Sequence, residues 1–405
     1  MRLSKRAESI QASPIRKLAP LAVRAKARGI SIYHLNIGQP DIPTPEAYLK
    51  AVQRYGGPVL SYGPSDGLPE LKKAVSTYFA ANSIEIAPEE LIITTGGSEA
   101  ALFALNLVGD PGDEVIVPEP FYTNYNGFAT LAGMKVVPVT TRAEDGFHLP
   151  PMEDIEKKVT SRTRAILVCS PNNPTGTILA REELEGLARI ALQHGLFLIG
   201  DEVYKEFTYD GGHHTSLLEL PEVRENAIVV DSISKRFSAC GARIGALISR
   251  NEDVIDMAMK FAQARLCPPT IEQLGAAEAY KLGRDYFDGV RTEYQQRRDA
   301  LLEGLSAHSG IYVKKPAGAF YMVLRLPVDD TESFARWMLD EFEVDGETVM
   351  VAPAAGFYAT PGLGMNEVRV AYVLQIPRLK KAANILVEGV RAYNRSRGRS
   401  VAAGS

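Results

Sequence analysis

The sequence is poor in the residues from which disulfide frameworks and metal sites are built. It contains three cysteines, Cys169, Cys240 and Cys267, which lie far apart and form no CxxC pair. The six histidines show no spacing typical of metal ligands, and we interpret His213 and His214, in a glycine-rich turn, as a solvated surface pair. We therefore expect neither a disulfide framework nor a bound metal, and the cysteine pattern fits the reducing cytosol.

Long apolar runs and an excess of basic charge are also missing. No apolar run approaches the length of a membrane span. The formal net charge is -4, which argues against a general binder of nucleic acid or of membrane surfaces. No GxxxxGK[ST] motif occurs, so a Walker phosphate loop is excluded. We expect a cytoplasmic protein without a nucleic-acid or membrane partner.

The composition that remains is that of an ordinary globular protein, with 45% apolar and 23% charged residues. A chain of 405 residues is expected to form two domains. Between about residues 90 and 250, β-rich runs alternate with helical patterns such as 181–195. This alternation predicts an α/β fold with a mostly parallel seven-stranded sheet flanked by helices. The predicted strands are LIITT, EVIV, KVVPV, AILVCS, LFLIG, AIVVD and IGALIS.

The pattern changes after about residue 290, where a long charged helix leads to shorter strands and a closing helix. This predicts a smaller α+β domain. We divide the chain into an N-terminal arm with part of the small domain (1–47), a large domain (48–290) and a C-terminal small domain (291–405). The basic N-terminus is expected to form an amphipathic arm that docks on the body or on a partner subunit, and the tail from Tyr393 is expected to fray.

Polar clusters follow several predicted strands, at the sheet edge where ligands of parallel sheets gather. In TTGGSEA, Gly97 and Ser98 begin a helix whose free N–H groups suit a phosphate, although a serine-capped turn needs no ligand. In LFLIGDEVY, Asp201 and Glu202 reach the sheet edge with Tyr204 close behind. A buried carboxylate there suits a cationic ring nitrogen, and a structural helix cap is the alternative.

Two further clusters complete the set. In SPNNPTG, prolines and glycine form a rigid turn that holds the Asn173 amide at the sheet edge, either over a ligand or only as a turn. In DSISKRFSACGARIG, Lys235 comes at a strand end, where its charge is costly unless paired or removed, as in a Schiff base with an aldehyde. Ser232 and Ser234 add hydroxyls, and the Arg243 guanidinium can clamp phosphate oxygens.

Together these clusters meet the needs of pyridoxal 5′-phosphate. From about Ile30 to Val387, the sequence resembles the class I/II aminotransferases related to aspartate aminotransferase, which are fold-type I pyridoxal-phosphate enzymes. The resemblance implies that Lys235 forms the Schiff base with the cofactor and moves the substrate proton. It implies that Asp201 pairs with the ring nitrogen, and that Tyr204 and Asn173 bind the ring oxygen. The phosphate site that it implies consists of Gly97, Ser98, Glu99, Ser232, Ser234 and Arg243.

Other motifs extend the resemblance. In PEPFYTNYNGF, Tyr122 takes the place of the ring that covers the cofactor, with Phe121 as the alternative in register. In LNIGQPDIPTP, Gly38 would offer its backbone to the substrate carboxylate and close as a lid. In LSYGPSDGLPE, Tyr62 would reach the cofactor phosphate of a neighbouring subunit, which implies a homodimer with shared sites. In NEVRVAYV, Arg369 would bind the α-carboxylate.

The resemblance implies a pyridoxal-phosphate-dependent aminotransferase that works by a ping-pong mechanism. The donor would be an L-amino acid, with aspartate as the first choice and aromatic or neutral amino acids next, and the acceptor a 2-oxo acid such as 2-oxoglutarate. Arg265 is a candidate for binding the distal carboxylate of such a donor. The alternative is that it forms a salt bridge at an interface. Two alternatives stay open: a lyase, decarboxylase or synthase with the same cofactor, and a non-catalytic ligand-sensing domain of a regulator.

Overall fold

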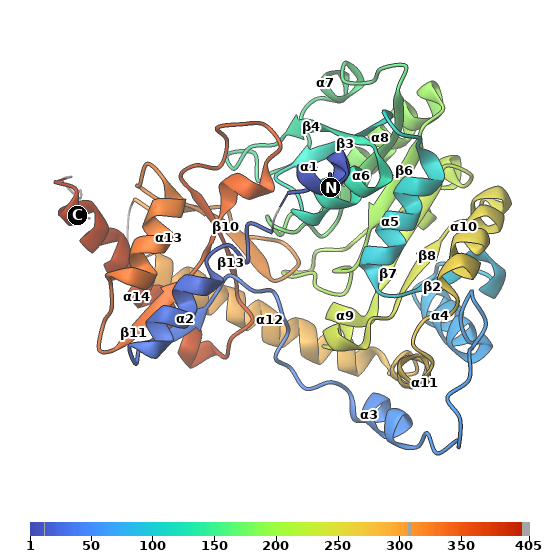
Figure 1. Cartoon of the computed structure of the whole chain (residues 1–405), viewed down its shortest axis with the longest axis horizontal. Coiled ribbons are helices and arrows are strands. Elements are labelled where there is room, and N and C mark those ends of the chain that lie inside the picture. The colour runs from blue at the N-terminus through green and yellow to red at the C-terminus, as the bar shows by residue number, and fades with distance from the viewer. Residues whose placement is uncertain (12, 307–309, 399–405) are drawn as a thin grey trace.

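A seven-stranded sheet forms the centre of the computed structural model, which describes residues 1–11, 13–306 and 310–398 (Figure 1). In spatial order its strands are β2 (Leu91–Thr94), β8 (Gly245–Ile248), β7 (Ala227–Ser232), β6 (Phe197–Asp201), β5 (Thr163–Cys169), β3 (Glu114–Glu119) and β4 (Lys135–Thr140). All pairings are parallel except the two made by β8. The mostly parallel α/β sheet predicted from the sequence is therefore confirmed.

Helices cover both faces of this sheet, because alternate strand residues point to opposite sides. Ile92 of β2 packs into one core, whereas its neighbours Leu91 and Ile93 pack into the other. The first core is closed by α5 (Gly97–Val108), α6 (Asn124–Ala132) and α10 (Glu252–Arg265). The second is closed by α4 (Pro69–Ala81), α8 (Arg181–His194) and α11 (Thr270–Ala279). The predicted stop of α8 is confirmed, because Gly195 adopts the left-handed conformation (φ 63°) at its C-cap.

A second body is built around a four-stranded antiparallel sheet. Its strands, in order, are β12 (Ala352–Pro353), β13 (Glu367–Ala371), β10 (Tyr321–Arg325) and β9 (Tyr312–Val313). Its helices are α12 (Arg284–Leu305), α13 (Thr331–Asp340) and α14 (Ile376–Ser396). In Figure 1, α12 runs from this body to the large sheet. The positions of the domain boundaries remain predictions.

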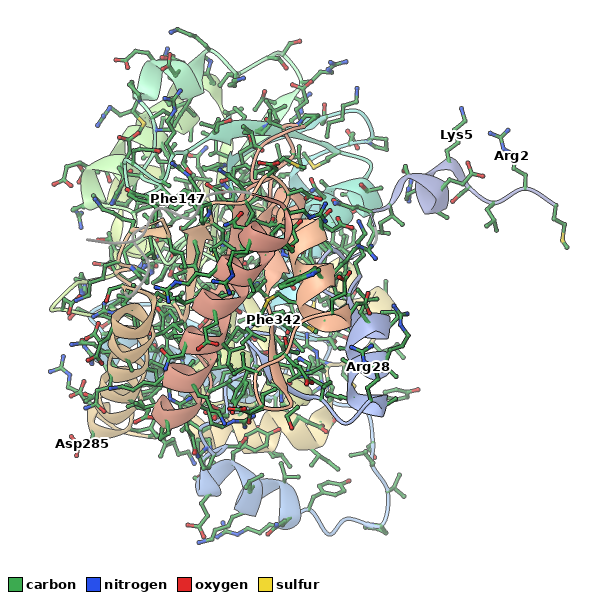
Figure 2. All side chains as sticks on the ribbon, turned by 90° about the vertical axis from the view of Figure 1, so that its left-hand side faces the viewer. Arg2, Lys5, Arg28, Phe147, Asp285 and Phe342 are labelled. Atoms are coloured by element: carbon green, nitrogen blue, oxygen red, sulfur yellow. The ribbon has the colours of Figure 1, made fainter. Side chains whose placement is uncertain are left out.

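The N-terminal part of the chain packs on this second body. β1 (Ser31–His34) pairs in parallel with β11 (Glu347–Met350). The helix α2 (Ala19–Ala27) lies against β1 and α13. Before it, α1 (Lys5–Ser9) buries no residue, and Figure 2 shows Arg2 and Lys5 projecting away from the body. The short helices α3 (Glu46–Gln53) and α7 (Met152–Glu156) complete the described set, together with α9, which belongs to the site below.

The C-terminal tail was expected to fray from Tyr393, and the described part of it does not. Tyr393 and Asn394 are buried in the last turns of α14, which continues to Ser396, so their contacts hold the helix. The rest of the predicted tail, 399–405, lies outside the described residues. Within the described residues, no helix combines the length and the apolar character needed to cross a membrane.

Candidate active site

A cavity of about 800 Å³ lies between the two bodies, at the carboxyl ends of the parallel strands. One side is lined by the last residues of β5, β6 and β7, which are Cys169, Asp201 and Ser232. The other side is lined by Tyr321 of β10 and Arg369 of β13. Of the residues predicted from the sequence, the structure brings together on its wall Gly38, Gly97, Ser98, Tyr122, Asn173, Asp201, Tyr204, Ser232, Ser234, Lys235, Arg243 and Arg369.

Lys235 lies on α9 (Ile233–Arg236), a single helical turn directly after β7. Ser232 caps this turn, because its Oγ accepts a hydrogen bond of 3.1 Å from the Ser234 N–H. The Lys235 ammonium donates to the Gly38 carbonyl at 2.9 Å and lies 3.8 Å from Cys240 Sγ. The amine is therefore aimed into the cavity from a short, capped element.

Asp201 is a buried carboxylate at the end of β6, the strand next to β7, which leads into the Lys235 turn. Tyr125 Oη donates to its Oδ2 at 2.6 Å, and the Val203 N–H lies 3.3 Å from its Oδ1. Burial raises the pKa of Asp201 to about 6, although both donors act to lower it. A carboxylate desolvated in this way gains from a nearby cation, so the site fits a protonated ring nitrogen.

The start of α5 and Arg243 form an anion cradle. Arg243 adopts the left-handed conformation (φ 54°) and donates to the Cys240 carbonyl at 2.9 Å. Its guanidinium lies against Gly96, where an added Cβ would lie 2.4 Å from Nη2. Arg243 forms no ion pair with a carboxylate of the described residues. A free guanidinium beside the N-terminus of a twelve-residue helix fits a phosphate group.

Arg369 is a second cation without an acidic partner in the described part of the chain. Only 2% of its surface is exposed, and its guanidinium donates to Asn173 Oδ1 at 3.1 Å and to the Asn36 carbonyl at 2.5 Å. It lies 4.5 Å from the ring centre of Tyr321 and 5.0 Å from that of Phe357. Burial lowers the pKa of Arg369. A buried guanidinium is costly without an anion, so this position fits a carboxylate ligand.

Two tyrosines line the cavity beside these charges. Tyr204 Oη lies 3.0 Å from Tyr321 Oη, and burial raises the pKa of Tyr204. Tyr122 accepts a hydrogen bond of 2.8 Å from the Asn124 amide, and burial raises its pKa to about 12. Phe121, the alternative in register, is buried in the core rather than in this cavity. The phenols of Tyr204 and Tyr122 therefore stay protonated at neutral pH.

Three predicted site residues do not line the cavity. Tyr62 is 80% exposed. Glu99 Oε2 accepts from the Thr95 N–H at 2.7 Å and lies 3.7 Å from Arg265 Nε. Arg265 also donates to the carbonyls of Ser65 and Ile93, at 3.1 Å each. Their roles in cofactor and substrate binding stay predictions.

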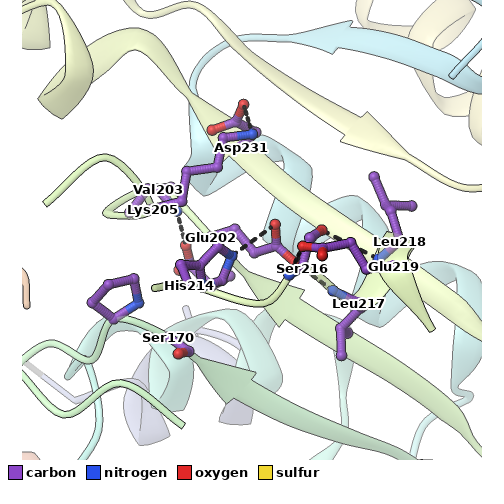
Figure 3. A network of polar contacts seen from close by, with 12 residues as sticks. Ser170, Glu202, Val203, Lys205, His214, Ser216, Leu217, Leu218, Glu219 and Asp231 are labelled. Carbon is purple, nitrogen blue, oxygen red and sulfur yellow. Dashed lines mark hydrogen bonds and ion pairs between the residues drawn. The ribbon is translucent and has the colours of Figure 1, made fainter. Parts of the chain in front are cut away.

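The interpretation of His214 as a surface residue is wrong (Figure 3). Only 8% of His214 is exposed, and its Nε2 lies 3.2 Å from Glu202 Oε2. Glu202 turns away from the cavity because it follows Asp201 on an extended chain, where successive side chains point to opposite faces. It accepts from Ser216 Oγ and from the Leu217 N–H, each at 2.9 Å. His213 is exposed, as expected.

Two cations that sequence reasoning missed also line the cavity. Arg16 and Lys26 belong to the N-terminal arm, and neither forms an ion pair with a described carboxylate. Their neighbours Lys17 and Arg24 face outward and pair with α13, with Lys17 Nζ 2.7 Å from Glu332 and Arg24 3.5 Å from Asp340. The arm's basic residues were the available signal, but their pattern did not show which ones face a ligand.

Known proteins resemble this chain over most of its length. Residues 30–383 match the family model for aminotransferase class I and II. The aspartate/prephenate aminotransferase of Thermus thermophilus is 34% identical over 385 residues, which are 94% of this chain and 96% of that protein. The aromatic-amino-acid aminotransferase 2 of Thermococcus litoralis is 34% identical over 393 residues, with 94% and 96% covered.

Solved structures agree as well. A single mutant of the Thermus thermophilus aspartate aminotransferase has a TM-score of 0.87 at 33% identity, with 96% of this chain and 100% of that chain covered. The alanine aminotransferase of Pyrococcus furiosus has a TM-score of 0.87 at 31% identity, with the same coverage. The fold and the site thus define a fold-type I enzyme.

The chain belongs to the class I and II aminotransferase family. It is an aminotransferase, and its family implies dependence on pyridoxal phosphate. No group of three or more potential metal ligands occurs among the described His, Cys, Asp and Glu side chains.

Proposed function

We propose that this enzyme binds pyridoxal 5′-phosphate in the cavity around Lys235 and transfers the amino group of an L-amino acid to a 2-oxo acid. The observation that carries the proposal is the set of three buried or half-buried charges that line one cavity: an amine, a carboxylate with a raised pKa and the Arg369 guanidinium without an acidic partner. These are the groups that an aldehyde, a ring nitrogen and an α-carboxylate require.

The chain's own residues would divide the work of holding the cofactor. Gly97, Ser98, Ser232, Ser234 and Arg243 would bind the phosphate. Asp201 would face the ring nitrogen, Tyr204 and Asn173 the ring oxygen, and Tyr122 the ring itself. When bound, the cofactor supplies an aldehyde and an electron sink.

Lys235 and Arg369 would act on the substrate. Arg369 would bind the α-carboxylate in bidentate fashion, in exchange for its contact with the Asn36 carbonyl. The rings of Tyr321 and Phe357 beside the guanidinium exclude water and strengthen that contact. Lys235 Nζ, released from the Gly38 carbonyl, would take the proton from the substrate Cα and return it.

Two charges that line the cavity favour a donor with an acidic side chain. With Arg243 and Arg369 assigned to phosphate and α-carboxylate, Arg16 and Lys26 are cavity-lining cations left for a distal anion. Aspartate is therefore the first donor to test and 2-oxoglutarate the first acceptor, followed by aromatic and neutral amino acids. Arg265 stays a candidate for the same role, although its guanidinium is engaged by two carbonyls outside the cavity wall.

We further propose a cytoplasmic homodimer with shared sites. Val59, Leu60 and Tyr62 form an exposed, partly apolar segment, with 69%, 57% and 80% of their surfaces accessible. A second copy of the chain would cover these side chains and bring Tyr62 to the neighbouring cofactor phosphate. The three cysteines are free, which suits a reducing compartment.

The half-reaction tests the proposed chemistry. The loaded enzyme, given an amino donor without acceptor, should release one 2-oxo acid per site and change its visible absorbance, and 2-oxoglutarate should restore the original spectrum. Lys235→Met should lose both the visible band and the turnover. Release of CO2 or of a β-substituent would favour the lyase or decarboxylase alternative, and binding without turnover would favour the sensing domain.

A further inference from the structure

One segment, residues 35–44, lines the cavity from the side of the second body. We call this segment the strap. Its first residue is held between β11 and β13, because the Leu35 N–H donates to the Met350 carbonyl at 2.9 Å and the Leu35 carbonyl accepts from the Ala371 N–H at 2.7 Å. Near its other end, Thr44 Oγ1 donates to the Ser238 carbonyl at 2.9 Å. The strap thus joins the strands of the second body to the turn that follows Lys235.

The first half of the strap is held by Arg369 and Lys235, the two cations that the proposed function assigns to substrate and cofactor. The Asn36 carbonyl accepts from Arg369 at 2.5 Å, and the Gly38 carbonyl accepts from Lys235 at 2.9 Å. If Arg369 exchanges the Asn36 carbonyl for a carboxylate and Lys235 exchanges the Gly38 carbonyl for the cofactor, both contacts would be lost. Another contact must then hold the strap so that Gly38 stays correctly placed over the substrate.

Asp41 and Arg297 supply such a contact, and neither of them belongs to the groups assigned to the reaction. Arg297 of α12 is almost fully buried, and its Nη1 donates to Asp41 Oδ1 at 2.5 Å and also to the Val373 carbonyl. Its Nε donates to Glu293 at 2.8 Å. One guanidinium therefore ties the strap to α12 and to the chain just beyond β13, the strand that carries Arg369.

The strap has little freedom in where it lies. A Cβ added at Gly38 would lie 1.7 Å from Tyr321 Oη, so the backbone there sits directly on the tyrosine. Tyr321 in turn contacts Tyr204 and the Arg369 guanidinium. A small displacement of the strap would disturb the place where the α-carboxylate is expected to bind.

We propose that Asp41 and Arg297 are positioning residues, which hold the strap so that Gly38 closes over the substrate carboxylate after Lys235 and Arg369 have released it. The inference rests on the proposed function. Neither residue lines the active cavity, so neither is placed in contact with the reacting atoms. Removal of the pair should weaken substrate binding and leave cofactor binding and the chemical step largely intact.

The test uses the loaded, full-length enzyme and the single-turnover half-reaction at increasing donor concentration. Asp41→Asn and Arg297→Lys should each raise the apparent Kd for the donor about tenfold and change the limiting rate by less than about threefold. Asp41 is 39% exposed in its side chain, so the isosteric Asp41→Asn is not expected to unfold the chain. Cofactor loading is measured separately from the visible absorbance.

Glu293→Gln is the matched control, because it removes the other carboxylate on the same guanidinium without touching the strap. It should leave the apparent Kd unchanged. An unchanged Kd in Asp41→Asn, an equal rise in Glu293→Gln, or a loss confined to the limiting rate would overturn the proposal. A wild-type enzyme without half-reaction would instead refute the proposed function.

Discussion

Asp201 is a carboxyl group that is only 8% exposed, at the wall of the cavity. Its pKa is raised by burial to about 6, against an ordinary value of about 3.9. Between these two values the folded state binds more protons than the unfolded state. The free energy of unfolding of the cofactor-free enzyme therefore falls as pH rises through this window.

Asp201→Asn should remove this pH dependence. From pH 5 to pH 8 the stability of the variant relative to the cofactor-free wild type should grow by about 1.4 kcal/mol, because the wild type loses a bound proton that the amide does not carry. Denaturant unfolding at the two pH values measures it. A difference that stays constant with pH would show that Asp201 titrates normally. The same variant should bind the cofactor more weakly, because the amide does not balance a ring cation.

Arg16 and Lys26 should determine preference for acidic donors. Arg16→Ala and Lys26→Ala are each expected to lower kcat/KM for aspartate about tenfold or more and to leave a neutral donor nearly unchanged. Lys17→Ala and Arg24→Ala are matched controls from the same arm, since their side chains pair with α13 instead. Arg265→Ala in the same assay tests the competing assignment of Arg265 to the distal carboxylate. Our assignment would be contradicted if Arg265→Ala lowered kcat/KM for aspartate alone while Arg16→Ala and Lys26→Ala left it unchanged.

The turn between β7 and α9 depends on a buried ion pair. Arg236 Nη2 lies 2.8 Å from Asp231 Oδ1, and neither side chain is exposed. Burial opposes the charge on Asp231, but Arg236 and Lys205 outweigh it, so the pKa of Asp231 lies below its ordinary value. Since Lys235 directly precedes Arg236, this pair fixes the element that presents the amine.

Arg236→Met should destabilise the protein by about 3–5 kcal/mol, because it leaves the Asp231 carboxylate buried with only Lys205 beside it. Cofactor occupancy at a fixed concentration should fall as well. Arg291→Met, at an exposed pair with Asp288 on α12, should change the stability by less than about 0.5 kcal/mol. Denaturant midpoints and visible absorbance measure both effects, and equal behaviour of the two variants would be inconsistent with a supporting role.

The elements of the large sheet were predictable because their signals are local. β7 reads as a short apolar run, and α8 as an apolar pattern of helical period that ends at Gly195. The pairing of β1 with β11 was not predictable, because it joins segments more than 300 residues apart. The burial of His214 was missed for a different reason: its own surroundings read as a turn, and the sequence does not show that the connection after β6 folds back so that His214 packs against Glu202.

The site was predictable to the extent that strand ends converge. Parallel strands deliver Asp201, Ser232 and the Lys235 turn to one edge, so these residues meet in the structure as the motifs suggested. Which cations face the cavity depends on how the arm and α10 pack. Arg16 was therefore overlooked, and Arg265, which the sequence offered as one candidate for a distal carboxylate, does not line the cavity.

The proposed dimer with shared sites can be tested by complementation. A Tyr62→Ala chain keeps Lys235, and a Lys235→Ala chain keeps Tyr62, so a mixed dimer would contain one complete site if Tyr62 acts across the interface. The mixture, after dissociation and reassociation, should recover the cofactor affinity that Tyr62→Ala homodimers lack. No recovery in a dimer verified by sedimentation would mean that Tyr62 does not act in trans.

The attachment of the arm to α13 has a consequence for selectivity. Lys17, Arg24 and Arg28 bind the arm to the body that also carries Arg369. Arg16 and Lys26 therefore travel with Arg369 whenever the two bodies move relative to each other. If Arg369 binds one carboxylate and Arg16 and Lys26 the other, the distance between the two binding positions is set within one body, and it would select diacids by the length of their carbon chain.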